Sequence, residues 1–352
     1  MTYYLIYLCL FPFLLLASFF RKEKSNKNLI IQTAKIGDYV NTSVLFNKLK
    51  TTDIIIDKIN YDFAKSDTHI DKIYLIQDFK VKRYQNAMKL FFTNYNNIYV
   101  VMPNSYNLFL GKMCFAKECI TIKHYASKWY EKLLMKKIKI IYHSVEDLTI
   151  KTYLNMVDEY DMKKNWKSIP IKIPDTSMIE SKKFKVGISL TAGNKIKTID
   201  RETWRKVFKI LDKFDLEIYI FGLQNEQKYL EKILKFNTRN SIISLLGKIT
   251  LEELPFYISQ MKLYISSDTG NSYIADTVKI PTINFAGPCF WQEQRPIYKT
   301  SMIVKSNVKE TPFSSVFKAS FEYSGKSLFS VNELQIKSIE DFIAQIYRDF
   351  LS

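Results

Sequence analysis

Cysteine and histidine are scarce in this sequence, and their scarcity limits the chemistry that the chain can carry. The 352 residues include only four cysteines and three histidines, and their spacing matches no zinc-ligand pattern. Free thiols in a reducing compartment are the simplest interpretation. We therefore expect no metal site and no cofactor. The complete set is Cys9, Cys114, Cys119, Cys289, His69, His124 and His143.

Two short motifs are also missing. No Asp-x-Asp occurs anywhere in the chain, and no Gly-x-Gly-x-x-Gly follows the first predicted strand. The second absence argues against a dinucleotide-dependent oxidoreductase, which an α/β chain would otherwise allow.

Acidic residues are outnumbered by basic ones. The chain has 35 Asp and Glu against 52 Lys and Arg, which gives a formal net charge of +17. Such a balance indicates an anionic partner, which is nucleic acid, an anionic membrane surface or a phosphorylated substrate. The alternative is that the lysines are only solvated. No recognised fold motif or aromatic-basic platform supports nucleic-acid binding, so we expect no nucleic-acid partner.

The longest apolar run stands at the amino terminus. Residues 1–20 are apolar almost throughout, and the basic segment RKEKSNK follows them. A helix of about 20 residues spans a bilayer core, and charge that follows the run argues against a cleaved signal peptide and keeps the remainder in the cytoplasm. We predict that residues 1–27 are a membrane-anchor helix with its basic flank. A helix lying in the membrane interface, a cleaved signal peptide and packing against the rest of the protein are the alternatives.

The remainder alternates between β-rich runs and helical segments, which predicts an α/β fold with mostly parallel sheets. The first set occupies residues 28–165 and opens with the strand NLIIQT, a loop and a helix. Residues 166–183 contain prolines and no clear period, so we interpret them as a linker. A second set occupies residues 184–330, and residues 331–352 form a C-terminal helix. Two such sets predict two Rossmann-like domains facing a cleft, with ligands beyond the carboxyl ends of the strands.

The segment SSDTGNSYIADTVKIPTINFAGP contains the most specific local signal. Asp268, Thr269 and Gly270 stand where a predicted strand ends and a helix begins. Backbone N–H groups and the positive end of a helix favour anions at such a turn, and Gly270 lets a ligand approach the backbone closely. The alternative is that Asp268 is an ordinary helix N-cap.

Other predicted strands end in polar groups at the same edge. Thr250 and Glu253 have the spacing of a capping box. The remaining groups are Gly37 and Asp38 in the first domain, and Gly193, Lys195, Lys197, Gly222 and Glu226 in the second. This convergence indicates a ligand site more strongly than any single motif does.

In their order and spacing these motifs resemble glycosyltransferase family 9, the ADP-heptose:lipopolysaccharide heptosyltransferases. The resemblance runs from about Asn28 to Pro296 and is strongest in the second domain. The segments that carry it are LIIQTAKIGDYVNTSVLFNKLK, HSVEDLTIKTYL, KTIDRETW, Gly222 with Glu226, GKITLEE, DTGNSYIA and AGP.

The resemblance implies a GT-B fold and an inverting, metal-independent transfer. The N-terminal domain binds the acceptor, and the C-terminal domain binds the nucleotide-sugar. Asp38 is implied as the general base that takes a proton from the acceptor hydroxyl, and Lys197 as the cation that neutralises the donor diphosphate. The donor implied is ADP-heptose, and the acceptor is a lipid-linked glycan of the lipopolysaccharide or lipooligosaccharide core. The implied location is the cytoplasmic face of the bacterial inner membrane.

The resemblance also assigns substrate-binding residues. Glu226 is implied to hold the ribose hydroxyls, Ile249 to pack on the base, and Asp268 to bind hydroxyls of the transferred sugar. The N–H groups of Thr269 and Gly270 are implied to face the phosphates. The remaining substrate-binding positions are Lys35, Gly37 and Tyr273.

Three departures from the family pattern leave the identity of the transferred sugar undetermined. Tyr273 stands where the family usually has histidine, Ile199 and Asp200 replace Trp-Pro, and Lys35 replaces a small residue. They leave two alternatives, which are a family member that uses another nucleotide-sugar donor and a non-catalytic homologue that binds nucleotide-sugar.

Overall fold

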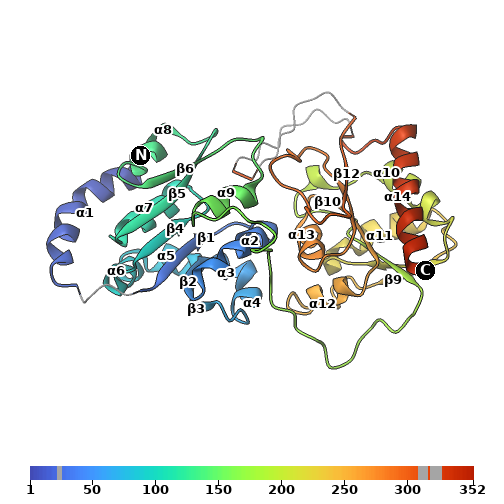
Figure 1. Cartoon of the computed structure of the whole chain (residues 1–352), viewed down its shortest axis with the longest axis horizontal. Coiled ribbons are helices and arrows are strands. Elements are labelled where there is room, and N and C mark those ends of the chain that lie inside the picture. Colours follow the sequence, from blue (N-terminus) through green and yellow to red (C-terminus); the bar gives the residue numbers. More distant parts are fainter. Residues whose placement is uncertain (22–25, 308–315, 318–326) are drawn as a thin grey trace. The chain divides into compact units, whose positions relative to one another are not determined.

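The computed structural model describes residues 1–21, 26–307, 316–317 and 327–352. The chain divides into two compact units, Met1–Ser168 and Ile169–Ser352. Each unit is an α/β structure with helices covering a sheet (Figure 1). Parts of the predicted basic flank and of the predicted second domain lie outside the described residues.

Unit 1 is built on a six-stranded parallel sheet with the order β3-β2-β1-β4-β5-β6. Its strands are rich in isoleucine and mostly buried, as expected for a parallel sheet with helices on its faces. Six β-rich runs of this part of the sequence predict strands, and all six strands are present: NLIIQT, TDIIID, DKIYLI, NIYVVM, ECITI and KIKIIY. Their bounds are β1 (Asn28–Gln32), β2 (Thr52–Ile56), β3 (Ile70–Leu75), β4 (Asn97–Val100), β5 (Glu118–His124) and β6 (Lys139–His143).

The helices of unit 1 differ from prediction after strands β1 and β6. The segment AKIGDYVN, residues 34–41, was predicted as a loop, but its residues from Ile36 on belong to helix α2, so Gly37 and Asp38 lie in the first turn of that helix. Four of the seven residues of this helix, from Tyr39 to Thr42, have buried side chains, and this burial outweighs the low helix propensity of glycine. Residues 143–160 have the periodicity of a helix, but the first of them, His143, ends strand β6. The helices are α1 (Thr2–Ser18), α2 (Ile36–Thr42), η1 (Ser43–Leu45), α3 (Phe46–Leu49), η2 (Lys58–Asn60), α4 (Tyr61–Ala64), α5 (Ile76–Val81), α6 (Arg83–Thr93), α7 (Ser105–Met113), α8 (Trp129–Leu134) and α9 (Thr149–Asn155).

The apolar amino-terminal run forms α1, which lies along α7 at the outside of unit 1 (Figure 1). Tyr7 and Leu14 are buried in the core of this unit, and the Tyr3 and Tyr106 ring centroids are 5.1 Å apart. Among the residues that the structure describes, no helix is long and apolar enough to cross a membrane. One side of this run packs into the unit 1 core instead of being apolar surface all round.

Unit 2 contains a second six-stranded parallel sheet, with the order β12-β11-β10-β7-β8-β9. Both sheets have the Rossmann strand order, in which the chain reverses direction beside the first strand. Strand β12 was not predicted, because a three-residue strand shows no periodicity. The bounds are β7 (Phe184–Ile188), β8 (Leu216–Ile220), β9 (Ser241–Ser244), β10 (Leu263–Ser267), β11 (Thr282–Phe285) and β12 (Met302–Val304).

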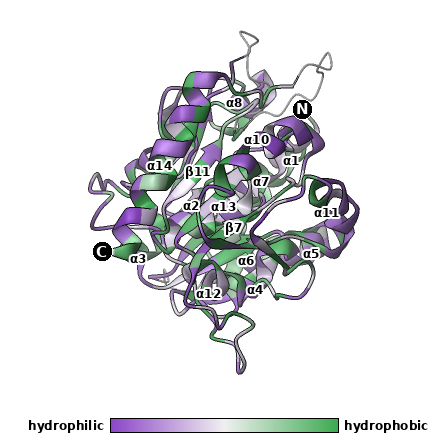
Figure 2. Cartoon of the chain, turned by 90° about the vertical axis from the view of Figure 1, so that its right-hand side faces the viewer, coloured by the Kyte–Doolittle hydropathy of each residue, from purple (hydrophilic) through white to green (hydrophobic). Residues whose placement is uncertain are grey.

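The helices of unit 2 are amphipathic, and α14 shows a hydrophilic and a hydrophobic side in Figure 2. In α10, Trp204 and Val207 are buried at helical spacing, and the Asp200 carboxylate caps the helix by accepting the Thr203 N–H at 2.9 Å. Helix α12 begins three residues later than predicted, because Glu253 binds back to Thr250 in a preceding turn. The helices are η3 (Lys195–Lys197), α10 (Arg201–Leu211), η4 (Gln224–Glu226), α11 (Gln227–Leu234), α12 (Leu254–Ser259), α13 (Gly270–Thr277) and α14 (Glu333–Leu351).

Candidate functional site

The two central strands of the unit 2 sheet bring Lys197 and Asp268 together. Strands β7 and β10 pair in parallel, so the segments that follow them meet at one edge of the sheet. Lys197 Nζ lies 2.6 Å from Asp268 Oδ2. Both side chains are mostly buried, with exposed fractions of 23% and 12%. The motif around Asp268 and the lysine motif therefore form one site, although the two residues stand far apart in the sequence.

The Asp268 carboxylate has two further donors. The Tyr273 hydroxyl donates to Oδ1, and the Cys289 thiol donates to Oδ2 at 3.2 Å. Burial acts to raise the pKa of Asp268, but the Lys197 charge and the hydrogen bonds outweigh it and hold the pKa below its usual value. The carboxylate is therefore ionised at neutral pH and stays so inside the site.

Asp268 does not cap a helix, so the alternative that it is an ordinary N-cap is wrong. Helix α13 begins at Gly270, and its N-cap is Thr269. The Thr269 hydroxyl is buried, and among the described residues it has no hydrogen-bond partner. The first turn of α13 thus combines the positive end of a helix, an unsatisfied hydroxyl and the nearby Lys197 ammonium, all of which favour an anion.

Tyr273 lies one turn into α13, and its side chain is almost completely buried at 2% exposure. Its ring packs in the interior, while its hydroxyl orients the Asp268 carboxylate. The residue that replaces the usual histidine of the family thus both packs and positions a site residue.

Glu226 is held close to the backbone at the end of strand β8. Its carboxylate accepts the Leu223 N–H at 2.9 Å and the Thr191 hydroxyl. A Cβ atom on Gly222 would lie 2.7 Å from Glu226 Oε1, so a larger residue at this position would displace the Glu226 carboxylate. Thr191 follows the neighbouring strand β7, and the arrangement places Glu226 at the same edge as Lys197.

Ile249 lies in the turn after strand β9 and is half-buried. Gly247 begins this turn with φ of +67°, a left-handed conformation that favours glycine. Its N–H donates to the Gly222 carbonyl at 3.0 Å. This hydrogen bond ties the loop that carries Ile249 to the loop that carries Glu226.

In unit 1, the segment after β1 is fixed by buried polar side chains. The backbone carbonyl of Asp38 accepts the Thr42 hydroxyl at 2.8 Å and the Gln32 amide at 3.3 Å. The Asp38 side chain is half-buried in the first turn of α2, while Gly37 is buried and Lys35 is exposed at the N-cap position. Asn107, from α7 after β4, donates to the Thr33 hydroxyl at 2.7 Å. Asp38 therefore lies where the two central strands of this sheet end.

The structure adds residues that the sequence alone did not single out. Cys289 directly follows Gly287-Pro288, yet only the fold shows that its thiol reaches Asp268. His124 and His143 were interpreted as scattered, but they stand opposite each other on β5 and β6. His143 Nδ1 lies 2.7 Å from the Thr152 hydroxyl, and burial, together with His143, lowers the pKa of His124 to about 4. Among the described residues, no group of His, Cys, Asp and Glu could hold a metal ion.

The two parallel sheets with Rossmann strand order form a GT-B-like fold, which heptosyltransferase structures share. The sequence model of glycosyltransferase family 9 (heptosyltransferase) matches residues 118–319. This match covers more than half of the chain, so the chain belongs to this family and is a glycosyltransferase. A search of curated proteins found no match.

Solved structures share this fold at low sequence identity. The E. coli ADP-heptose lps heptosyltransferase II is 12% identical, with a TM-score of 0.70 over 93% of this chain and 100% of that one. A family 9 glycosyl transferase from Veillonella parvula is 15% identical, with a TM-score of 0.65 over 92% and 98%. The E. coli heptosyltransferase WaaC, solved with ADP, is 14% identical, with a TM-score of 0.61 over 91% and 99%. At these identities the similarity establishes the fold.

Proposed function

We propose that this glycosyltransferase transfers a heptose or related sugar from an ADP-sugar to a core sugar of a lipid-linked glycan, with inversion and without a metal ion. The acceptor proposed is a lipopolysaccharide or lipooligosaccharide core, reached at the cytoplasmic face of the bacterial inner membrane. The observation that carries the proposal is the Lys197–Asp268 pair beside the amino end of α13.

The donor side supplies the charge that the leaving group needs. As the sugar–phosphate bond breaks, negative charge grows on the diphosphate oxygens. The Lys197 ammonium and the N–H groups of Thr269 and Gly270 are preorganised to stabilise such charge. Lys197 then moves part of its interaction from Asp268 to the diphosphate, and Asp268 keeps its ionised oxygens for hydroxyls of the sugar. A structure of similar fold favours ADP as the nucleotide of the donor, because E. coli WaaC was solved with ADP and with ADP-2-deoxy-2-fluoro heptose.

The acceptor side supplies a base. A sugar hydroxyl is a weak nucleophile until a carboxylate accepts its proton, a step that contributes roughly 10²–10⁴-fold. Asp38 is the carboxylate at the carboxyl edge of the unit 1 sheet, with its backbone held by Gln32 and Thr42. One base and direct attack by the acceptor hydroxyl give inversion at the transferred carbon.

The donor nucleotide is tested by a thermal-shift titration of the full chain with ADP, UDP and GDP. A ligand at about 100 times its dissociation constant stabilises the protein by about 2.7 kcal/mol. Selective stabilisation by ADP, followed by transfer from ADP-heptose to a core acceptor, is the expected result. If no nucleotide stabilises a folded protein, the proposal fails.

A second candidate is the same reaction with a different nucleotide-sugar. Tyr273, in place of the histidine usual in the family, favours it because this side chain orients the carboxylate assigned to the sugar. Stabilisation by UDP or GDP instead of ADP would establish this candidate.

A further inference from the structure

Helix α1 is apolar on both of its sides. The side that faces unit 1 buries Tyr7 and Leu14, as already described. The other side, which we call the outer face, consists of Leu5, Leu8, Phe13, Leu15 and Leu16, with Phe19 and Phe20 just beyond the helix. Phe13 is 70% exposed and Phe20 is 87% exposed. Surface helices of globular proteins normally carry polar residues on the outward side, so α1 presents an unusual apolar surface.

The orientation of this surface is fixed by contacts at both ends of α1. Near its start, the Tyr3 ring centroid lies 5.4 Å from that of Phe109. Just beyond its end, the Arg21 guanidinium donates to the Phe115 carbonyl at 2.7 Å and lies 4.5 Å from the centre of the Phe91 ring. These contacts hold the inner side of α1 against unit 1, so the outer face remains directed away from it.

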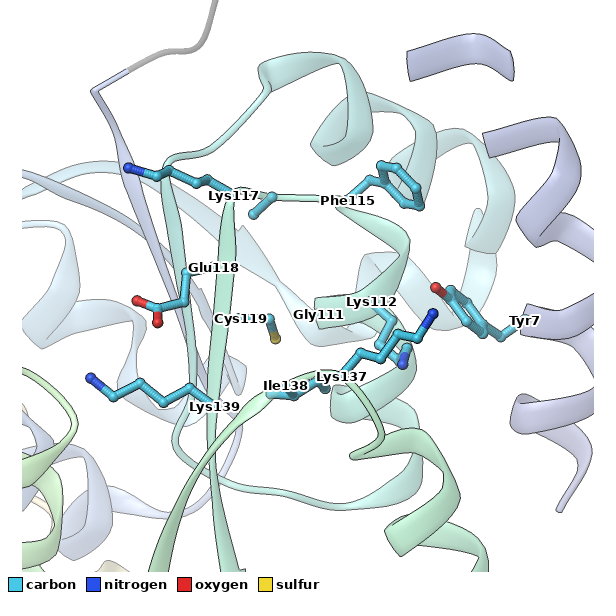
Figure 3. A pocket seen from close by; sticks show the side chains of 11 residues that line it. Tyr7, Gly111, Lys112, Phe115, Lys117, Glu118, Cys119, Lys137, Ile138 and Lys139 are labelled. Carbon is cyan, nitrogen blue, oxygen red and sulfur yellow. The ribbon is translucent and has the colours of Figure 1, made fainter. Parts of the chain in front are cut away.

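A basic cavity of about 420 Å³ adjoins α1, and Tyr7 forms part of its lining. Lys112 and Lys137 extend toward Tyr7, whereas Lys117, Glu118 and Lys139 lie on the opposite side (Figure 3). The Lys112 ammonium lies 4.8 Å from the centre of the Tyr7 ring and donates to the Lys136 carbonyl. Burial lowers the pKa of Lys112, and the Lys137 charge lowers it further. Two ammonium groups that face one cavity repel each other, and a bound anion would relieve that repulsion.

We propose that unit 1 binds an anionic phospholipid bilayer, with α1 in the plane of the interface. In this arrangement the outer face of α1 inserts among the acyl chains, and the cavity between Lys112 and Lys137 accepts a lipid phosphate. Interfacial helices bury their apolar side roughly 5–10 Å deep and combine this with attraction to anionic lipids. The charge favours a bilayer over a second copy of the chain, because two molecules of net charge +17 repel each other whereas an anionic leaflet attracts them.

The apolar part of the proposal is tested by co-sedimentation of the full chain with vesicles. Phosphatidylcholine vesicles are compared with vesicles of phosphatidylcholine and phosphatidylglycerol in a 7:3 ratio. We expect binding to the anionic vesicles, and at least a tenfold loss in the double variant Leu8→Ser, Leu16→Ser. The matched control is Leu234→Ser, Leu334→Ser, two exposed leucines of unit 2, which should bind as the wild type does. Equal loss in both double variants, or no binding by the wild type, overturns the proposal.

The basic part is tested with the double variant Lys112→Gln, Lys137→Gln. Each basic side chain near an anionic surface contributes about fivefold in affinity, so binding to anionic vesicles should fall roughly 25-fold. Binding to neutral vesicles should not change. The control is Lys209→Gln, Lys235→Gln, which removes the same charge from exposed positions of unit 2. An equal loss in the control variant overturns the cavity as the binding site.

The position of α1 is tested by fluorescence. Phe13→Trp places an indole on the outer face, and brominated lipids should quench its added emission when the bromines lie at shallow depth. Sedimentation velocity tests whether a second copy of the chain covers the outer face instead of a bilayer. Self-association of the wild type that the Leu8→Ser, Leu16→Ser variant abolishes, without quenching in vesicles, shows that a second copy covers α1 and overturns the proposal.

Discussion

Lys197 Nζ lies 2.6 Å from Asp268 Oδ2, and this contact joins the segments that follow the two central strands of unit 2. The pair is more than a surface ion pair, because both side chains are mostly buried and Tyr273 and Cys289 also donate to the carboxylate. Exposed ion pairs contribute little to stability. The Lys197–Asp268 pair, in contrast, is mostly buried and holds a cation next to the amino end of α13. The arrangement is suited to an anionic ligand that shares Lys197 with Asp268.

Lys197→Ala should lower kcat/KM for transfer by about 10²–10³-fold, because it removes charge stabilisation that preorganised donors supply to a leaving group. Lys195→Ala is the matched control, since Lys195 is exposed in the same short helical turn. Steady-state kinetics with both variants measures the difference. Equal values of kcat/KM for the two variants would show that Lys197 does not stabilise the leaving group.

Asp38→Asn should lower the transfer rate by about 10²–10⁴-fold and leave nucleotide affinity unchanged, because it removes a general base on the acceptor side. Asp62→Asn is the control, since Asp62 is an exposed carboxylate of unit 1 that pairs with Lys65. Single-turnover transfer and nucleotide titration distinguish the two effects. An unchanged transfer rate in Asp38→Asn would show that another group accepts the proton.

Gly222→Ala should weaken nucleotide binding by about tenfold, a loss of about 1.4 kcal/mol. The added methyl group would stand 2.7 Å from Glu226 Oε1 and displace the carboxylate. Gly193→Ala is the control, because no atom lies within 4 Å of the methyl group it would add. Calorimetric titration of both variants gives the comparison, and identical affinities would argue against Glu226 as a nucleotide contact.

The ion pair should also give the free energy of unfolding a specific pH dependence. The pKa of Asp268 is lower in the folded protein than in the unfolded chain. The resulting stability is therefore complete above the unfolded pKa, near 4, and is lost as the pH falls through the folded pKa. Urea unfolding from about pH 6 to about pH 2 should show the wild type losing stability relative to Asp268→Asn toward the acid end. If the difference in the free energy of unfolding between the two proteins stayed constant across this range, the partners of Asp268 would not lower its pKa.

The strands of both units were predictable from the sequence because each is a short β-rich run between polar segments. The alternation of strands and helices also predicted parallel sheets, and parallel sheets place the ends of their strands at one edge. For that reason Lys197, Glu226 and Asp268 were expected at the same edge of unit 2. The three-residue strand β12 and the helical state of Gly37 and Asp38 were missed, since neither has a local signal.

The sequence by itself determined the family, the α/β class and the edge of each sheet at which polar residues gather, because hydrophobic periodicity and motif spacing are local properties of the chain. Only the tertiary structure decided which groups share a site. The contact of Cys289 with Asp268, the facing pair His124 and His143, and the packing of α1 on α7 depend on strand order and burial. A long apolar run has the same local pattern whatever it contacts, and only the fold shows that one side of this run packs on α7.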